Sequence, residues 1–301
     1  MKTLTLTILL SLALAPAQDS KKEKKKKNPG ALSFAGAAAE TYKEASGSRL
    51  KLYLFRPEGH QAGDKRPAIV FFFGGGWNGG SPKQFEPHAR YLASRGMVAI
   101  VADYRVKSRQ KTSPFECVKD GKSAVRWLRK NSERLGIDPS RLAAGGGSAG
   151  GHVAAASGTV PGLEEDGEDT SVSSLPNALV LFNPVFDNGP MGYGHSRVKD
   201  RFREISPIHN LSKKTPPTIV FLGTKDKLVP VSTAQRYKTL MEKSGRRCDL
   251  HLYKDQPHGF FNGPDRGGSF NPYYLKTVTA MDRFLASLGY LKGEPTIRRP
   301  D

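Results

Sequence analysis

A serine flanked by glycines is the residue of this chain best placed to act as a nucleophile. Ser148 lies in a G-x-S-x-G pattern over residues 146–150, after the run RLAA at 141–144 and before the small-residue run at 152–156. A strand, a sharp turn and a helix in this order expose a serine hydroxyl at a helix N-terminus, where developing negative charge is stabilised. Glycines suit such a turn, because larger side chains would collide with the strand or the helix. In a glycine-rich chain the same pattern also arises by chance or as a plain turn.

An apolar run upstream of this serine ends abruptly in three glycines. Residues 68–73 (AIVFFF) are typical of a strand buried on both faces, and Gly74, Gly75 and Gly76 follow directly. Glycines let the backbone approach a ligand and point its N–H groups at it, which is what an oxyanion hole requires. The alternative interpretation is a tight turn from strand to loop.

An acid and a histidine follow two later strand-like runs. Asp226 comes just past the apolar run at 218–222, and His258 lies on a Pro/Gly loop after the strand-like residues 251–253. Ligand sites in open parallel sheets lie at the carboxyl ends of strands, and a carboxylate there can orient a histidine that takes a serine's proton. A surface aspartate and a solvated histidine are the alternatives. Asp249 and Asp255 compete for the acid's role, but neither follows a buried strand so cleanly.

These motifs together resemble the α/β-hydrolases of the esterase/lipase group that includes hormone-sensitive-lipase-like enzymes and acetyl esterases. The order Ser148, Asp226, His258 is the order of that fold, and the matches run from about Arg49 to about Leu291. The similar segments are GGGW at 74–77, like the group's HGGG(W) motif, DYR at 103–105, GIDPSR at 136–141, GGSAGGH at 146–152 and HGF at 258–260.

The resemblance implies a function for each of these motifs. Ser148, Asp226 and His258 would be the catalytic residues, and the amides of Gly75, Gly76 and Ala149 would form the oxyanion hole. The activity implied is the hydrolysis of carboxylic esters through an acyl-enzyme. The group usually has a histidine before the glycines that pins the oxyanion loop by hydrogen bonding, whereas this chain has Phe73. We therefore expect packing to hold the loop instead.

The elements that must position these residues indicate an α/β fold. Strand-like runs such as 97–101 and 178–182 alternate with helical stretches, of which 114–135 is the clearest. This alternation predicts a parallel central sheet flanked by helices, in one domain over residues 31–301. The resemblance implies that the sheet is mostly parallel and has about eight strands.

Residues 187–210 interrupt the alternation at the place where the resembled group often inserts a lid, so the resemblance implies a short cap insertion here. The segment is rich in Gly, Arg and Lys, and its small size predicts an open site. An open site favours polar or bulky esters, such as acetylated sugars, over long lipids. Trp77, Met191 and Tyr193 are predicted to bind substrate at the pocket or its rim, and ordinary packing is the alternative for each.

The N-terminus predicts export. Residues 1–17 combine Lys2, an apolar stretch from Leu4 to Ala15 and an A-x-A-like site, which together are typical of a cleaved signal peptide. The Lys-rich residues 18–30 predict a disordered linker. We therefore expect a secreted or periplasmic protein, with the linker either a solvated tether or an arm for an anionic cell surface or polysaccharide.

Charge and composition exclude several other classes of protein. The net charge is +19, from 47 Lys and Arg against 28 Asp and Glu, but no nucleic-acid-binding motif accompanies it. No CxxC or HExxH spacing and no GxGxxG after a strand is present, so we expect neither a metal nor a cofactor. The sequence does not define the oligomeric state.

The remaining cysteines and histidines receive structural interpretations. Cys117 and Cys248 are expected to be free and buried, because their elements should lie too far apart for a disulfide. His152 is interpreted as a packing or hydrogen-bonding residue. His88, like His195 and His209, is interpreted as solvated or as a cap.

The functional hypothesis is thus an exported serine carboxylesterase that hydrolyses short acyl esters, above all acetyl esters, possibly on polysaccharide. A serine peptidase of the prolyl-oligopeptidase type is one alternative, although that class usually has a large N-terminal gating domain that the sequence does not show. A non-catalytic polyanion-binding protein on the same fold is the other, with the basic surface as its function.

Overall fold

The computed structural model describes residues 32–266 and 268–299, and from Ser33 onward the chain forms one compact unit. Two predicted segments lie outside the described residues, namely the signal peptide at 1–17 and the Lys-rich linker at 18–30. No helix within the described ranges combines the length and the hydropathy that a membrane span requires.

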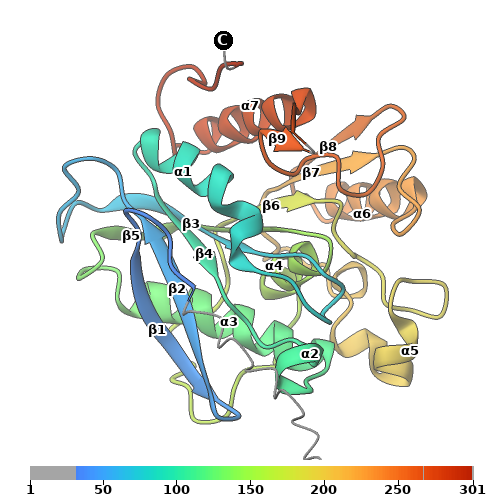
Figure 1. The fold of residues 1–301 in the computed structure, drawn as a ribbon. Helices are drawn as coiled ribbons and strands as arrows, with labels where there is room; N and C mark the ends of the chain where they lie inside the picture. The colour runs from blue at the N-terminus through green and yellow to red at the C-terminus, as the bar shows by residue number, and fades with distance from the viewer. Residues whose placement is uncertain (1–31, 267, 300–301) are drawn as a thin grey trace, which may run out of the picture. The chain divides into compact units, whose positions relative to one another are not determined.

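Eight strands form the central sheet, in the spatial order β1-β2-β4-β3-β5-β6-β7-β8. β2 pairs antiparallel with β1 and β4, and every other neighbouring pair runs parallel (Figure 1). The prediction of a mostly parallel sheet of about eight strands is therefore confirmed. The strands are β1 Ala38–Ala45, β2 Ser48–Phe55, β3 Arg66–Phe72, β4 Val98–Ala102, β5 Ile137–Gly147, β6 Ala178–Phe182, β7 Thr218–Gly223 and β8 Cys248–Tyr253, with a separate ribbon of β9 Asp265–Arg266 and β10 Ser269–Phe270.

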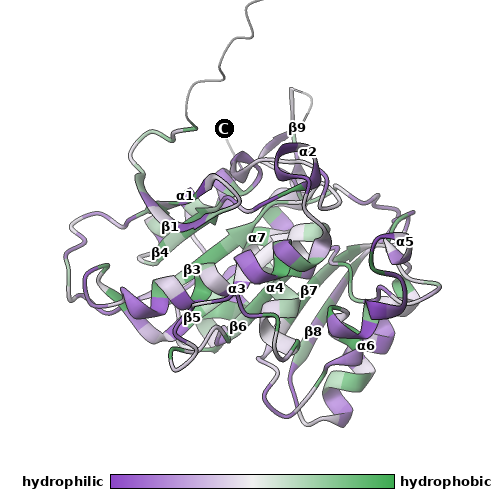
Figure 2. Ribbon diagram, turned by 90° about the horizontal axis from the view of Figure 1, so that it is seen from below, coloured by the Kyte–Doolittle hydropathy of each residue, from purple (hydrophilic) through white to green (hydrophobic). Residues whose placement is uncertain are grey.

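Helices cover both faces of the sheet, as the alternation of elements predicts. α1 and α7 lie on one face, and α3, α4 and α6 lie on the other (Figure 1). Figure 2 shows mostly hydrophobic strands behind helices of mixed hydropathy. The helices are α1 Glu86–Ser94, α2 Lys107–Gln110, α3 Pro114–Lys130, α4 Ala149–Thr159, α5 His195–Val198, α6 Val231–Lys243 and α7 Pro272–Ser287, with 3-10 helices η1 Pro82–Phe85, η2 Lys199–Glu204 and η3 Pro207–His209.

The central strands are continuous apolar runs because helices cover both of their faces. Every residue of β4, β6 and β7 is buried, which is the pattern expected of parallel strands. The neighbouring strands β3, β5, β6 and β7 run parallel, so their carboxyl ends meet at one edge of the sheet. Polar residues that follow these strands are therefore brought close together.

Local sequence signals define the start of α3, the longest helix. Ser113 and Glu116 form a reciprocal capping box around its first turn. The helix ends at Lys130, before the predicted end at Leu135, because the side chain of Asn131 donates to a backbone carbonyl of the last turn. Leu135 is still buried, in the turn that leads to β5.

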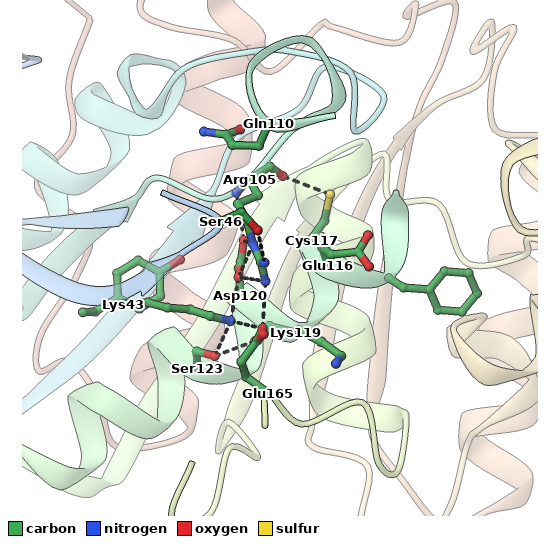
Figure 3. Close-up of polar contacts among 12 residues, drawn as sticks. Lys43, Ser46, Arg105, Gln110, Glu116, Cys117, Lys119, Asp120, Ser123 and Glu165 are labelled. Atoms are coloured by element: carbon green, nitrogen blue, oxygen red, sulfur yellow. Dashed lines mark hydrogen bonds and ion pairs between the residues drawn. The ribbon is translucent and has the colours of Figure 1, made fainter. Parts of the chain in front are cut away.

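A buried ion cluster ties the β1–β2 hairpin to the body of the fold (Figure 3). Asp120 of α3 is fully buried, and one of its carboxylate oxygens lies 2.7 Å from Lys43 Nζ of β1 and 2.7 Å from Arg105 Nη2. Glu165, which follows α4, lies 2.5 Å from the same Lys43 atom and 2.7 Å from the same Arg105 atom. Ser123 accepts a further hydrogen bond from Lys43. Every charge in the cluster thus has partners of opposite sign, which compensates the cost of burying it.

His88 of α1 is buried in an aromatic part of the core, so its interpretation as a solvated or capping residue is wrong. Its ring centroid lies 4.9 to 5.2 Å from those of Phe85, Phe182 and Tyr274. Neither ring nitrogen has a hydrogen-bond partner among the described residues. Burial lowers the pKa of His88 to about 3, so the imidazole is neutral at pH 7.

Acid is expected to weaken the folded state through His88. The pKa of an unfolded histidine is about 6.5, whereas the folded pKa of His88 is about 3. Between these two values only the unfolded chain binds the proton, so the free energy of unfolding falls as the pH falls. This histidine alone should remove on the order of 2 kcal/mol between pH 7 and pH 5.

The variant His88→Leu should lose this part of the pH dependence. Urea unfolding of wild type and variant at pH 7 and pH 5 measures it. The difference between the two pH values carries the test, so a general cost of the substitution does not affect it. Equal losses in the two proteins would show that His88 is not the source.

The two cysteines are free and buried, as predicted. Cys117 lies in α3, where its Sγ atom is 3.1 Å from the carbonyl oxygen of Arg105. Burial raises the pKa of the Cys248 thiol to about 12 and also raises that of Cys117. Neither side chain is a thiolate near neutral pH, which argues against either of them as a nucleophile.

Candidate active site

The turn between β5 and α4 holds Ser148 in a backbone conformation that few non-glycine residues adopt. Its φ is +55° and its ψ is −120°. Two glycines allow this turn, since a Cβ atom on Gly146 would lie 2.5 Å from the carbonyl carbon of Gly150, and one on Gly150 would lie 2.1 Å from the carbonyl oxygen of Phe72. The structure thus has the strained turn that the glycine pattern predicts.

The three side chains predicted to carry the chemistry form one chain of hydrogen bonds. Ser148 Oγ lies 2.8 Å from His258 Nε2, and His258 Nδ1 lies 2.7 Å from Asp226 Oδ2. The Asp226 side chain is fully buried, and that of His258 is 23% exposed. The other carboxylate oxygen of Asp226 accepts from the amides of Leu228 and Val229 at 2.8 and 3.0 Å. These two amides fix the carboxylate against the imidazole.

The chemistry of the partners places the protons along this chain. A carboxylate can only accept, so His258 Nδ1 carries a proton and donates it to Asp226. His258 Nε2 then presents a lone pair, to which the Ser148 hydroxyl donates. This is the tautomer in which an imidazole can remove the proton of a serine.

The loop after β3 presents backbone amides beside this serine. The amide of Gly74 donates to Gln84 Oε1 at 2.6 Å, whereas no hydrogen bond among the described residues uses the amides of Gly75 or Gly76. Gly75 has a φ of +124°, and a Cβ atom there would lie 2.3 Å from the carbonyl oxygen of Gly79. The geometry therefore requires glycine at position 75. It leaves the amides of Gly75 and Gly76 available to an oxygen atom of a ligand.

Packing accounts for only part of what holds this loop, so the expectation built on Phe73 was incomplete. The Phe73 ring stacks on Tyr104 with centroids 4.2 Å apart. In addition, the Tyr104 hydroxyl donates to the Phe73 carbonyl at 2.6 Å, and the Arg197 guanidinium donates to the Gly76 carbonyl. Gln84 accepts from Gly74 and donates to Asn262 Oδ1 at 2.8 Å. Three hydrogen-bonding side chains thus hold the loop in this chain, which has Phe73 where the resembled group usually has a histidine.

The variant Gln84→Ala is expected to lower kcat about tenfold with a smaller effect on KM, since one hydrogen bond that positions the loop is lost. Steady-state kinetics on an aryl acetate measures both constants. Gln61→Ala removes an exposed glutamine away from the cavity and serves as the matched control. An unchanged kcat in Gln84→Ala would show that Tyr104 and Arg197 hold the loop without it.

An open cavity of about 590 Å³ contains Ser148 and His258. Its wall is mostly polar or glycine, and Arg197 is its one permanently charged residue. Of the three residues predicted to bind substrate, Tyr193 lies in this wall. The lining residues are Gly74, Gly75, Gly76, Asn78, Gly80, Ser81, Gln84, Ser148, Asn183, Tyr193, Arg197, Leu228, His258, Gly259, Phe261 and Asn262.

The other two residues predicted to bind substrate do not line this cavity but line neighbouring ones, so their contact with substrate stays a prediction. Trp77 is buried, and its indole N–H donates to His152 Nδ1 at 3.3 Å. Met191 is 99% exposed and lines an adjoining cavity of about 710 Å³ that shares Tyr193 and Leu228 with the first. The pattern of apolar residues gave no means of separating a ring used in packing from one that faces a ligand.

The segment 187–210, which the sequence analysis interprets as a short cap, is tied to α4 through His152. His152 Nε2 lies 3.0 Å from Asn188 Oδ1 and 3.1 Å from the carbonyl oxygen of Ile205. Burial lowers the pKa of His152 to about 4, so the ring is neutral. It accepts from Trp77 at Nδ1 and donates at Nε2. The interpretation of His152 as a packing and hydrogen-bonding residue is confirmed.

Sequence reasoning missed Asn183, which also contacts the imidazole. The residue follows β6, is buried and has a φ of +35°. Its Nδ2 atom lies 3.0 Å from His258 Nε2 and 3.3 Å from His258 Nδ1. The rule that selected Asp226, a polar residue directly after a buried strand, would also have selected Asn183. Gln84 had no comparable signal, because its role depends on the course of the loop it contacts.

Family models and solved structures match this chain. The BD-FAE family model matches residues 52–188, and the prolyl oligopeptidase family model matches residues 170–273. The structure of Thermogutta terrifontis esterase 2 phosphorylated by paraoxon is 43% identical with a TM-score of 0.82, over 87% of this chain and 98% of that one. The propionate-bound form of the esterase Est2 from the same species is 43% identical with a TM-score of 0.81, over 86% and 97%.

Among curated sequences, the acetylxylan esterase of Xylanibacter ruminicola is 28% identical over 213 residues, which are 64% of this chain and 41% of that protein. The chain spans about half the length of the first curated relatives it matches. The eight-stranded sheet, the serine turn and the likeness to solved esterases over nearly their whole length define the class of protein. The chain belongs to the esterase/lipase family of α/β-hydrolases.

Proposed function

We propose that the protein is a serine carboxylesterase that hydrolyses short acyl esters, above all acetyl esters. The observation that carries the proposal is the hydrogen-bonded chain from Ser148 through His258 to the buried Asp226, which opens on a cavity beside the free amides of Gly75 and Gly76. A nucleophile, a base and an anion-binding loop within one cavity are the parts that acyl transfer requires.

The proposed mechanism follows from the positions of the protons. His258, oriented by Asp226, removes the proton of Ser148 as the serine oxygen attacks the ester carbonyl. The amides of Gly75, Gly76 and Ala149 stabilise the oxyanion, and each is worth about 3 kcal/mol in the transition state. His258 then protonates the departing alcohol. Water, activated by the same imidazole, releases the acid from the acyl-enzyme.

Two observations support a short acyl group and a polar alcohol. The wall of the cavity consists mainly of glycine and polar side chains, with Leu228 and Phe261 as its strongly apolar residues, which favours a small acyl group over a long chain. The relative from Thermogutta terrifontis binds propionate and butyrate in its solved structures, and the relative from Xylanibacter ruminicola is an acetylxylan esterase. We therefore place acetylated polysaccharide among the substrates.

A series of p-nitrophenyl esters from acetate to octanoate, together with acetylated xylan, tests this function. We expect the highest kcat/KM at acetate or propionate and release of acetate from xylan. Activity on the aryl esters alone would remove the polysaccharide from the proposal and leave the esterase. The absence of activity that depends on Ser148 on every ester would refute the esterase itself.

The match to the prolyl oligopeptidase family over residues 170–273 favours one other candidate, because these residues contain Asp226 and His258. A peptidase would use the same nucleophile and base on an amide. Release of p-nitroaniline from a prolyl p-nitroanilide, at a rate comparable with ester hydrolysis, would favour the peptidase.

Export belongs to the same proposal and rests on the sequence of residues 1–17. The mature chain should begin near Gln18, and the Lys-rich linker would then precede the catalytic unit. Sequencing the N-terminus of the protein recovered from the medium or the periplasm tests this. An intact residue 1 in the cytoplasm would contradict it.

A further inference from the structure

We propose that the esterase recognises an anionic saccharide, and that a cationic subsite beside the catalytic cavity binds its carboxylate or sulfate groups. The subsite is the cavity of about 470 Å³ whose wall contains Lys107, Lys111 and Arg197. The inference rests on the proposed function, since it names the class of alcohol that carries the acyl group.

The subsite directly adjoins the catalytic cavity. Asn78 and Arg197 lie in the walls of both cavities. The amides of Lys107 and Ser108 donate to the carbonyls of Trp77 and Asn78 at 3.0 and 2.9 Å. The oxyanion loop is thus bonded to the segment that carries two of the cations, which fixes the position of the subsite relative to the loop beside Ser148.

The three cations are available to a ligand. Nearby Arg109 and Arg201 are paired with Asp103 and Glu204, whereas no ion pair among the described residues involves Lys107, Lys111 or Arg197. No acidic residue lines the subsite. The carboxylate of Glu116, in the capping box at the start of α3, accepts from the amide and hydroxyl of Ser113.

Aromatic rings, a carbonyl and a hydroxyl around the subsite position Arg197 and offer a further hydrogen bond. The guanidinium of Arg197 lies 5.5 Å from the Trp77 ring and 5.9 Å from the Tyr193 ring and donates to the carbonyl of Gly76, so these contacts restrict its position. The hydroxyl oxygen of Thr112 is buried and has no partner in the described residues. A saccharide can supply hydroxyls for such a group as well as an anion for the cations.

Because the proposed acyl group is short, the anionic group of the substrate must lie on the alcohol part of the ester. A short acyl chain occupies little space at Ser148, so the part of a substrate long enough to reach Lys107 and Lys111 is the alcohol. The chemistry that fits is an acetylated polymer of acidic sugars. Its negative charges would distinguish such a polymer from neutral xylan.

Two aryl acetates and a double variant test the subsite. 4-Acetoxybenzoate carries a carboxylate on the alcohol part, and its methyl ester is the neutral counterpart. In Lys107→Gln/Lys111→Gln we expect kcat/KM for 4-acetoxybenzoate to fall about tenfold, while the value for the neutral ester changes less than twofold. Added NaCl should reduce the preference of the wild type for the anionic substrate.

The control is Lys213→Gln/Lys214→Gln, which removes the same charge from two exposed residues that precede the amino end of β7. An equal loss in this control would assign the effect to net charge and overturn the subsite. Equal rates on the two substrates in all three proteins would also overturn it. Arg197→Gln provides a further variant, judged by the ratio of the two substrates because it also contacts Gly76.

Binding gives a readout that does not depend on activity. Calorimetry with an oligogalacturonate and with a sulfated oligosaccharide of similar length distinguishes carboxylate from sulfate recognition. Binding to the wild type that weakens about tenfold in Lys107→Gln/Lys111→Gln alone would support the subsite even if no ester were cleaved, in which case only the proposed function would fail. Failure of both oligomers to bind, together with unchanged kinetics in the double variant, would refute the subsite and leave the esterase intact.

Discussion

Ser148→Ala is expected to lower kcat on p-nitrophenyl acetate by between about 10⁴- and 10⁶-fold. The variant lacks the atom that attacks the ester, and His258 Nε2 then has no hydroxyl to deprotonate. The amides of the oxyanion loop remain, so a residual rate above that of water is expected rather than zero. The assay should use enough protein to detect this residual rate.

Ser157→Ala is the matched control for this substitution. Ser157 lies on α4, the helix that directly follows Ser148, and its hydroxyl donates to the carbonyl of Val153, away from the catalytic cavity. This control should keep kcat within about threefold, since one local hydrogen bond is lost. Activity of Ser148→Ala within tenfold of the wild type would mean that a different group attacks the ester.

Asp120→Asn is expected to lower the free energy of unfolding by about 3 to 5 kcal/mol. The substitution keeps the size of the side chain but removes the charge that faces both Lys43 and Arg105. Glu165 alone would then compensate two buried cations. Thermal unfolding should show a fall in Tm of roughly 10 °C for a unit of this size.

An exposed ion pair is the control for this effect. Glu44→Gln removes the partner of Arg49 on the β1–β2 hairpin, where both side chains are more than half exposed. Such pairs contribute 0 to about 1 kcal/mol. A loss in Asp120→Asn no larger than in Glu44→Gln would show that water or a shift of Glu165 replaces the lost charge.

The sequence predicted which polar residues the fold brings together at the candidate site, because their positions depend on a short-range rule. Ser148 and Asp226 each follow a buried strand, and parallel neighbours bring the ends of such strands together. The alternation of elements predicted the sheet for the same reason. The information needed was a strand, its end and the polar residue after it.

Positions that depend on contacts between distant segments could not be predicted in this way. His88 has the sequence environment of a surface helix, yet Phe182 and Tyr274 surround it in the folded chain. Trp77 follows the oxyanion glycines and invites an interpretation as part of the pocket, but His152 turns its indole inward. Neither outcome is encoded within the neighbouring residues, because each depends on which side chains the tertiary fold brings alongside.

The reactive groups lie at the ends of strands, whereas part of the cavity wall lies on the segment 187–210. This separation bears on how new specificities could arise in this enzyme. The serine, the acid and the backbone donors all stand on the ends of buried strands, whereas Tyr193 and Arg197 reach the cavity from a short surface segment. Loops of this kind tolerate exchange better than the scaffold does. Recombination at the two ends of this segment would therefore exchange it as one unit between related enzymes. The exchange would change the substrate range and leave the serine, the acid and the backbone donors in place.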